Sequence, residues 1–390
     1  MTALSSEMGI NIKKEICFRI FKVLKLLFYL IIMIWTEIKY KKSEVDQAGD
    51  ILVSENPSLT EIDRAITILD NWRSSHSFPL HVFKVRLKRV SKEVDPDALV
   101  VQRLKRTPAI IRKLEREQTK HMNLSQMQDI GGCRAVLSNV NLVRQLCEEY
   151  YEKGKHCDLK HEFKKKKDYI TNPKPDGYRS IHLIYKYDSD KKSKKYNGLL
   201  IEIQIRSKLQ HLWATAVETV GHFTNQALKS NEGDKDWIDF FKLISSFFAN
   251  MEGTYIVPDT PENEFELYTK VKELSKKLQV IQKIRSWSSL LKLLEDKKKF
   301  SAAFYLLDLN IDTKQLAITS FERNEEEAAN RAYSEAEKKT RDEKLNKDIV
   351  LVEADTTKEL KKAYPNYFLN TNEFIFILQK YLDNPPKPTL

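Results

Sequence analysis

Between Asp168 and Ser207 the chain concentrates side chains that are suited to chemistry on a nucleotide. Tyr178 follows a glycine on a loop, where its ring offers a flat face to a base. The cations of this loop and of the strand after it, which could meet phosphates, are Lys174, Arg179 and His182. Glu202 interrupts the apolar strand LLIEIQIRS. A carboxylate there is costly unless a cation pairs with it, and a metal ion is the obvious candidate.

A second carboxylate, Asp129, stands just before Gly131-Gly132 and a short buried strand predicted over residues 133–137. If this strand neighbours the one that holds Glu202, both carboxylates converge at one end of a sheet and can share a Mg²⁺ ion. By composition alone, Asp129 is more typical of a helix or a turn. Glu202, between two isoleucines, is harder to explain without a cation.

Four more cations lie upstream, in the segment QRLKRTPAIIRKLERE: Arg103, Lys105, Lys113 and Arg116. Proline is tolerated in a first helical turn, so we expect a helix from Pro108 to Thr119. Lys113 and Arg116 then share one helix face. Guanidinium planes can stack on adenine, and lysines hold phosphates as point charges. Taken alone, the stretch is more typical of a basic surface helix.

Four blocks resemble, in the correct order, the signature segments of RelA/SpoT-type alarmone synthetases: QRLKRTPAIIRKLERE, QDIGGCRAVL, DYITNPKPDGYRSIH and IEIQIRS. Members of that family move a pyrophosphate from ATP to the 3′-hydroxyl of GDP or GTP. The resemblance covers residues 43–250. It implies an α+β fold with a nucleotidyltransferase-like mixed sheet flanked by helices, to which this chain adds a smaller C-terminal α+β domain.

The resemblance also implies roles for individual residues. Asp129 and Glu202 hold Mg²⁺, Arg134 faces the donor phosphates, and Gln204 helps to orient the acceptor hydroxyl. The cations of the first block bind ATP: Arg103, Lys105, Lys113 and Arg116. The acceptor site comprises Tyr178 on the guanine, with Lys174, Arg179 and His182 around it. Whether Glu202 is also a general base stays open. His211 and Glu218 either support the site from the next helix or lie on a solvated helix face.

The chain departs from the family pattern at three points. Thr107-Pro108-Ala109 stands where the family usually has Ser, which bears on how ATP is seated. Arg179 stands where many long members carry Gln, which bears on the choice of acceptor. No His-Asp pair of the kind that binds the hydrolase metal precedes Gln102. We therefore expect a synthetase without a hydrolase half.

Composition and charge indicate anionic partners. The net charge is +11, which favours nucleotides, RNA or an acidic surface. The lysine run 164–167 leads into the nucleotide loop, so contact with phosphates is about as good an explanation as a solvated loop; for the run 191–195 the solvated loop is favoured. The four cysteines show no C-x-x-C or zinc-like spacing and are typical of a reducing cytoplasm, where we expect the protein.

Turn signals and composition divide the chain into four parts. These are an apolar N-terminal segment (1–42), the synthetase-like domain (43–255), a helical connector (256–300) and a ββαβα unit (301–390) in which we see no catalytic constellation. We expect helices over 43–50, 59–74, 79–94, 141–152, 208–228, 236–251, 325–344, 356–362 and 371–382. We expect strands over 133–137, 181–187, 199–205, 305–309, 315–321 and 349–352.

The N-terminal apolar run is interrupted by lysines and arginine, and its charge-free part, 26–36, is shorter than the about 20 residues of a spanning helix. It is an interfacial anchor, a packing helix or an upstream extension, and a peripheral membrane contact through residues 18–36 stays open. The sequence also leaves the oligomeric state open, a homo-oligomer included.

Three functions remain at this stage. The leading one is a Mg²⁺-dependent synthetase that makes guanosine tetra- or pentaphosphate from ATP and GDP or GTP. The second keeps the mechanism and changes the acceptor, as in toxin-type relatives that modify the 3′ end of tRNA or make adenosine alarmones. The third is an inactive nucleotide-binding regulator. Under the second function, the C-terminal unit is a regulatory or neutralising domain, or a phage or ligand sensor.

Overall fold

A computed structural model of the chain describes residues 35–116, 122–152, 159–224, 233–289, 292–295, 302–354, 357–364 and 371–387. Nearly all of the predicted N-terminal segment lies outside these residues, and so do Cys17 and Cys157. Over the part of the chain that is described, no helix is both long and apolar enough to cross a membrane.

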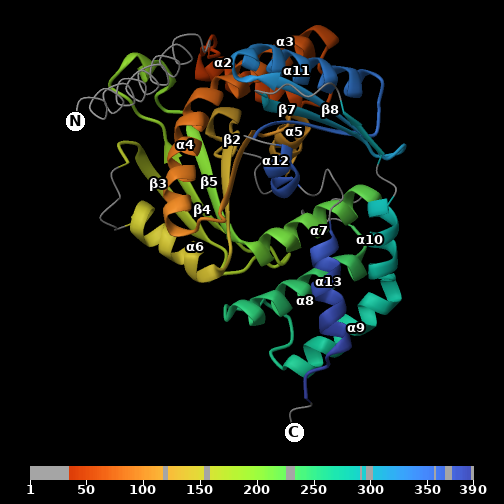
Figure 1. Ribbon diagram of the computed structural model, residues 1–390. Helices are drawn as coiled ribbons and strands as arrows, with labels where there is room; N and C mark the ends of the chain where they lie inside the picture. The colour runs from red at the N-terminus through yellow and green to blue at the C-terminus, as the bar shows by residue number, and fades with distance from the viewer. Residues whose placement is uncertain are drawn as a thin grey trace, which may run out of the picture.

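A mixed sheet of nine strands forms the centre of the described structure, in the order β3-β4-β5-β2-β1-β9-β7-β8-β6 (Figure 1). The strands are β1 (Leu99–Leu104), β2 (Gly131–Leu137), β3 (Glu162–Asp168), β4 (Ile181–Lys186), β5 (Leu200–Ser207), β6 (Lys292–Glu295), β7 (Ala302–Asn310), β8 (Gln315–Glu322) and β9 (Lys347–Glu353). The pairs β2–β5 and β6–β8 are parallel, and the other pairs are antiparallel. The predicted α+β class with a mixed sheet is confirmed.

Helices precede, connect and follow these strands. They are α2 (Lys42–Leu52), α3 (Leu59–Ser75), α4 (Ser77–Val94), α5 (Thr107–Glu115), α6 (Val140–Cys147), α7 (Lys208–Thr224), α8 (Lys235–Glu252), α9 (Glu264–Leu278), α10 (Val280–Ser289), α11 (Glu326–Asp342), α12 (Thr357–Ala363) and α13 (Asn372–Asp383). Short 3₁₀ turns cover Leu124–Gln126, Lys192–Tyr196 and Arg323–Glu325, and a π turn covers Glu148–Glu152.

The alternation of β5 separates the core from the site. Ile201, Ile203 and Ile205 are fully buried in the main hydrophobic core, which α2, α3, α4 and α6 share with the sheet. Since successive side chains of a strand point to opposite faces, Glu202 and Gln204 project from the other face. The strand is therefore anchored by its isoleucines and presents polar groups on one side.

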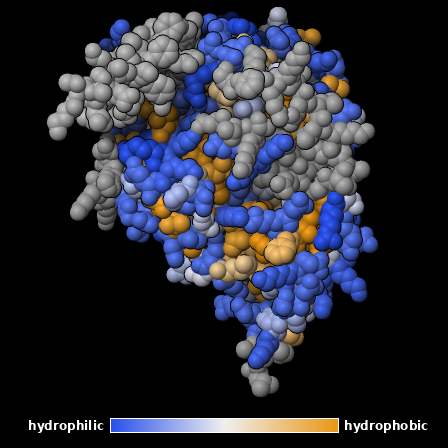
Figure 2. Space-filling view, in the orientation of Figure 1, coloured by the Kyte–Doolittle hydropathy of each residue, from blue (hydrophilic) through white to orange (hydrophobic). Residues whose placement is uncertain are grey.

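A helical lobe lies to one side of the sheet, where α7, α8, α9, α10 and α13 gather (Figure 1). Its own hydrophobic cluster includes Trp213, Phe241 and Phe374. On the face seen in Figure 2, hydrophobic residues gather over the region of α7 and α8 within a mostly hydrophilic surface. The last described helix, α13, thus packs on elements that begin 164 residues before it, since α7 starts at Lys208 and α13 at Asn372.

The C-terminal strands extend the sheet of the preceding domain. β9 pairs with β1 through Gln102↔Glu353 and Arg103↔Val352, and β7 and β8 continue outward from β9. The predicted ββαβα order is present as β7, β8, α11, β9 and α12. However, the expected boundary near residue 300 falls within one continuous sheet, so the division into separate domains stays a prediction.

Candidate active site

Glu202 is held as a charged carboxylate in the middle of β5, where only 6% of the residue is exposed. His182 Nδ1 lies 3.0 Å from its Oε1, and Gln204 Nε2 donates to its Oε2 at 2.6 Å. Burial by itself would raise the pKa of Glu202, but the charge and the hydrogen bond of His182, helped by Gln204, outweigh it and lower the pKa. The side chain is therefore ready to bind a cation.

Asp129 is held by two lysines in the turn before β2. Lys105 Nζ lies 2.8 Å from Oδ2, and Lys113 Nζ lies 2.8 Å from Oδ1. Lys105 comes from the end of β1 and Lys113 from α5, so two elements of the basic segment converge on one carboxylate. Burial opposes ionisation here, but the two ammonium groups bring the pKa of Asp129 well below its usual value.

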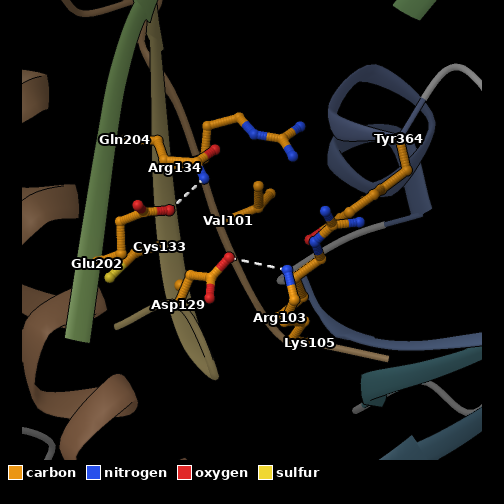
Figure 3. Close-up of a pocket in the computed structure, with 10 residues that line it drawn as sticks. Val101, Arg103, Lys105, Asp129, Cys133, Arg134, Glu202, Gln204 and Tyr364 are labelled. Atoms are coloured by element: carbon orange, nitrogen blue, oxygen red, sulfur yellow. Dashed lines mark hydrogen bonds and ion pairs between the residues drawn. The ribbon is translucent and has the colours of Figure 1, made fainter. Parts of the chain in front are cut away.

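Both carboxylates line one pocket (Figure 3). The parallel pairing of β2 with β5 places Gly132 beside Glu202 and Arg134 beside Gln204, which is the neighbourhood expected from the sequence. The residues that line the pocket are Val101, Arg103, Lys105, Asp129, Gly132, Cys133, Arg134, Glu202, Gln204 and Tyr364.

The donor set of this pocket fits a Mg²⁺ ion. In the described ranges no group of three or more His, Cys, Asp and Glu side chains is arranged to hold a metal. Mg²⁺ commonly takes only one or two carboxylates and completes its octahedron with water and substrate phosphates. Asp129 and Glu202, both ionised and facing one space, offer that arrangement.

A hydrogen-bonded chain links the predicted acceptor loop to Glu202. The hydroxyl of Tyr178 lies 2.8 Å from His182 Nε2, and the other ring nitrogen of His182 faces the carboxylate. Because a carboxylate oxygen only accepts, Nδ1 carries the proton toward Glu202. Lys174 Nζ lies 5.1 Å from the centre of the Tyr178 ring and 4.6 Å from that of Tyr169.

Gly177 is needed for this loop to pack. Its φ is +90°, a conformation that side chains rarely adopt, and a Cβ there would stand 2.9 Å from the Trp213 ring of α7. Tyr178 follows, and its NH donates to Asp176 Oδ1 at 2.8 Å. The Gly-Tyr pair noted in the sequence therefore fixes where the aromatic ring points.

Arg179 was predicted to meet the acceptor, and this prediction is wrong. Its side chain is 2% exposed and donates to Glu252 Oε2 (3.0 Å), Ser245 Oγ (3.1 Å) and Thr254 Oγ1 (3.0 Å). Successive side chains of an extended segment point to opposite sides, so Arg179 faces α8 while Tyr178 faces His182. Its role is to fasten the loop to the helical lobe.

Arg116 does not share a helix face with Lys113 as predicted. α5 ends at Glu115, and Arg116 is exposed in extended backbone, with φ −67° and ψ 134°. The predicted end of the helix, Thr119, lies outside the described residues. Arg103 and Lys105 line the pocket and Lys113 reaches it through Asp129, whereas Arg116 is not among the lining residues.

One arginine and one tyrosine extend the site beyond the predicted set. Tyr364, which follows α12, is 2% exposed, donates to the carbonyl oxygen of Gln102 at 3.1 Å, and lies with its ring centre 5.7 Å from Arg134 Cζ. Arg206 is buried on the same face of β5 as Glu202; burial, with the charge of Arg134, lowers its pKa to about 9. The period-two pattern of IEIQIRS could have identified Arg206, but nothing in the sequence connects Tyr364 to the pocket.

His211 and Glu218 flank this cationic group from α7. His211 is buried, with Nδ1 accepting from Arg206 and Nε2 donating to the carbonyl oxygen of Lys362 at 3.1 Å. Burial and the charge of Arg206 bring the pKa of His211 well below its usual value, so the ring is neutral. Glu218 is half-buried and its charge acts on Arg134 and Arg206. His211 is therefore not on a solvated face.

The central part of the chain matches a known protein family. Residues 102–226 match the family model described as the region found in RelA / SpoT proteins. The chain contains a RelA/SpoT-type domain. This matched region runs from β1 into the end of α7, and so includes both carboxylates and the acceptor loop. Helices α2 to α4 and everything from α8 onward lie outside it.

Relatives of the RelA/SpoT-type domain include small bacterial proteins. The chain is 29% identical over 171 residues to the GTP pyrophosphokinase YwaC of Bacillus subtilis (strain 168), which covers 40% of this chain and 78% of YwaC. It is 28% identical over 158 residues to the GTP pyrophosphokinase YjbM of the same strain, which covers 39% and 70%. A crystal structure of small alarmone synthetase 1 from Bacillus subtilis bound to pppGpp aligns with a TM-score of 0.38, at 24% identity over 46% of this chain and 89% of the other.

Proposed function

We propose that the chain is a Mg²⁺-dependent pyrophosphokinase that transfers the pyrophosphate of ATP to the 3′-hydroxyl of GDP or GTP. The observation that carries this proposal is the convergence of Asp129 and Glu202, both ionised, on one pocket with arginines and lysines around it. Phosphoryl-type transfer depends mainly on positioning and on stabilising charge, and this composition suits both. The names of the relatives YwaC and YjbM point to the same reaction.

The donor nucleotide is assigned to the side of the pocket formed by β1 and α5. Lys105 and Lys113 already stand at 2.8 Å from Asp129, so phosphates that enter here meet two ammonium groups. Arg103 and Arg134 supply guanidinium planes for the base or the phosphates. A Mg²⁺ ion held by Asp129 and Glu202 would neutralise charge on the phosphate oxygens.

The acceptor is assigned to the loop that carries Tyr178. Its ring takes the guanine, and Lys174, now beside the rings of Tyr169 and Tyr178, can move to the acceptor phosphates. Gln204 and Glu202 then orient the 3′-hydroxyl. The lowered pKa of Glu202 makes it a weak general base, which favours a role in holding the metal over proton abstraction.

A transfer assay tests the reaction and the acceptor together. The full chain is incubated with Mg²⁺, ATP labelled at the γ-phosphate and one acceptor at a time: GDP, GTP, ADP, ATP or bulk tRNA. We expect label on GDP and GTP. Label on ADP or ATP alone would identify an adenosine-alarmone enzyme, and label on no acceptor would favour an inactive nucleotide-binding regulator. Either result would overturn the proposal.

An RNA acceptor is the second candidate, and the exposed lysines of β3 favour it. Lys164 and Lys165 are exposed on this strand, which forms the edge of the sheet next to β4, and Lys167 pairs in register with His182. A basic edge that leads to the acceptor site suits a polyanion. An RNA acceptor predicts label on tRNA and a rate that falls steeply with salt, whereas a mononucleotide acceptor predicts a weak salt dependence.

We further propose that the C-terminal unit regulates the site. Tyr364 stands in the pocket next to Arg134, with its hydroxyl on the backbone of β1, so it occupies part of the donor side. The carbonyl of Lys362, from the same segment, holds His211. A unit that covers the donor side in this way restrains ATP binding until it moves.

A further inference from the structure

A second pocket lies where the C-terminal strands join the RelA/SpoT-type domain. Its walls come from α4 and β1 on one side and from β7, β9 and α11 on the other. The pocket is small, with a cavity volume of about 30 Å³. Most of the wall is apolar, and its uncharged or acidic polar side chains are Ser77, Gln102, Glu326, Asn330 and Glu353.

Three oxygen atoms of this pocket accept no hydrogen bond from any of the residues that the structure describes. They are Gln102 Oε1, Glu326 Oε2 and Asn330 Oδ1, and each belongs to a residue that is between 6% and 8% exposed. Buried acceptors almost always have a partner, because leaving one without a donor costs free energy. Three of them around one small space indicate a shared binding partner.

The neighbouring contacts fix which atom of Gln102 faces the pocket. Its Nε2 donates to Glu353, so exchanging the amide oxygen and nitrogen would break that hydrogen bond. Glu353 also receives Lys84 Nζ at 3.2 Å and Arg323 Nη1 at 3.1 Å. Burial opposes the charge of Glu353, yet His81, Lys84 and Arg323 lower its pKa to about 2. The negative charge of Glu353 is therefore already balanced by neighbouring cations, and this carboxylate does not require a bound ion.

Glu326 is in the opposite situation. It is the first residue of α11 and has a hydrogen bond from the buried Ser77, but Oε2 is without a partner. Burial, reinforced by the charge of Glu353, raises the pKa of Glu326 to about 8 although Arg323 opposes this. Unlike Glu353, it lacks a cation at short range among the described residues.

The number of donors limits what can fill the pocket. A single water molecule has two protons to donate and would leave one of the three acceptors unsatisfied. A cation is coordinated by all three oxygens at once and also balances the carboxylate. One carboxylate and two neutral amide oxygens match one positive charge, while a divalent ion would keep an excess charge in an apolar surrounding.

We propose that this pocket binds one monovalent cation, K⁺ or Na⁺, through Gln102 Oε1, Glu326 Oε2 and Asn330 Oδ1. Gln102 belongs to β1 of the RelA/SpoT-type domain, and the other two ligands belong to α11 of the C-terminal unit. The ion thus ties the two parts together. Arg103 borders both this pocket and the donor pocket, so the ion lies next to the nucleotide site. The proposal does not depend on the proposed function.

Thermal unfolding of the full chain, without nucleotides or Mg²⁺, tests the site. The Tm is measured in KCl, NaCl and choline chloride at equal ionic strength. We expect the Tm in KCl or NaCl to exceed that in choline by a few degrees and to saturate with concentration, because only an ion bound to the native state stabilises it. Equilibrium dialysis with radiolabelled rubidium or sodium should show one ion retained per chain.

Matched variants locate the ion. Glu326→Gln removes the charged ligand and Asn330→Leu removes a neutral one; both should lose the Tm increment and the retained ion. Glu327→Gln makes the same charge change at an exposed residue of α11, paired only with Arg331, and should keep both. If Glu326→Gln fails to fold, ion retention by the wild-type chain and by Asn330→Leu still decides the question.

Two results would overturn the proposal. One is a wild-type Tm that is the same in all three salts, with no ion retained. The other is a cation increment that survives in Glu326→Gln and Asn330→Leu. A Tm that rises as the pH falls through about 8 without any cation dependence would show that a protonated Glu326 donates to its neighbours instead.

Discussion

Glu202 keeps its charge in a position where burial alone would favour the neutral acid. The charge of His182 is the main source of compensation, and the hydrogen bonds from His182 and Gln204 add to it. The same imidazole is hydrogen-bonded to the hydroxyl of Tyr178, so the acceptor loop and the metal carboxylate share one side chain. Substitutions along the hydrogen-bonded series Tyr178–His182–Glu202 should therefore have separable effects on acceptor binding and on the charge of Glu202.

We predict that His182→Phe moves the acid limb of the activity profile to higher pH. The folded-state pKa of Glu202 is lowered, so its carboxylate form is present above that pKa and is lost as the pH falls through it. Without His182 the burial contribution dominates and the pKa rises. The pH dependence of kcat/KM for transfer to GTP measures this. His161→Phe is the control, because this imidazole hydrogen-bonds the Asp188 backbone and packs against Phe83 and Tyr187, away from Glu202; equal profiles for both variants would contradict the account.

Tyr178 should contribute through its ring. Tyr178→Ala removes the stacking face, and since stacking on an aromatic side chain is worth about 1–3 kcal/mol per base, the KM for the acceptor should rise about tenfold while the KM for ATP stays unchanged. Tyr178→Phe keeps the face and removes only the hydrogen bond to His182, so it should be much milder. Steady-state kinetics with each substrate varied in turn separate the cases. Equal losses for ATP and acceptor would show that the acceptor site is misplaced.

The site residues whose positions could be predicted are those whose neighbours in the sequence indicate which face or end of a strand they occupy. Glu202 stood out between two isoleucines, and Asp129 was placed beside it on the condition that their two strands are neighbours, which β2 and β5 are. Arg179 was misassigned because its buried partner, Glu252, lies 73 residues further along the chain. No local pattern in the sequence shows whether a loop cation such as Arg179 faces the acceptor site or packs against a helix.

At the scale of elements, the loop that carries Tyr178 is fastened to α8 by Arg179. We predict that Arg179→Met lowers the free energy of unfolding by about 3–5 kcal/mol, because it leaves Glu252 buried without its cation. The control is Arg89→Met, whose partner Glu93 is half exposed; this pair should be worth at most about 0.5 kcal/mol. Urea unfolding measures both. A small effect of Arg179→Met, or a raised acceptor KM in its folded form, would return Arg179 to the acceptor site.

Regular alternation made some elements predictable, and its absence hid others. β5, β7 and β8 alternate or run apolar and were expected close to their observed bounds. β3 was missed because it is an exposed edge strand made largely of lysines, and β1 because its basic residues were interpreted as the approach to a helix. The start of α3, expected at residue 59, is confirmed, and Ser58 closes a capping box with Glu61.

At the scale of the whole molecule, the C-terminal unit and the donor pocket are in contact. We predict that Tyr364→Ala lowers the KM for ATP at least about fivefold, since it removes the ring beside Arg134 from the donor side. Tyr364→Phe keeps the ring and loses only the hydrogen bond to Gln102, so it should stay close to the wild type. Initial rates at varied ATP measure the change. An unchanged or raised KM in Tyr364→Ala would argue against a covering role.

The joining of the two parts could not have been predicted from the sequence. The pairing of Gln102 with Glu353 spans 251 residues, and both strands look locally complete. The ββαβα order of the C-terminal unit was expected, but whether its sheet stands alone or extends another depends on an edge left free by β1. Long-range pairing of this kind has no signal in composition or periodicity.

The central claim is that Asp129 and Glu202 act together in transferring pyrophosphate to a guanine nucleotide. The most direct measurement compares wild type, Glu202→Gln and Glu162→Gln for transfer of label from γ-labelled ATP to GTP with Mg²⁺ present. Glu162 is an exposed carboxylate of β3 and serves as the control. We predict that wild type and Glu162→Gln transfer label, while Glu202→Gln falls about a hundredfold or more. A Glu202→Gln variant that transfers label at the wild-type rate would contradict the account.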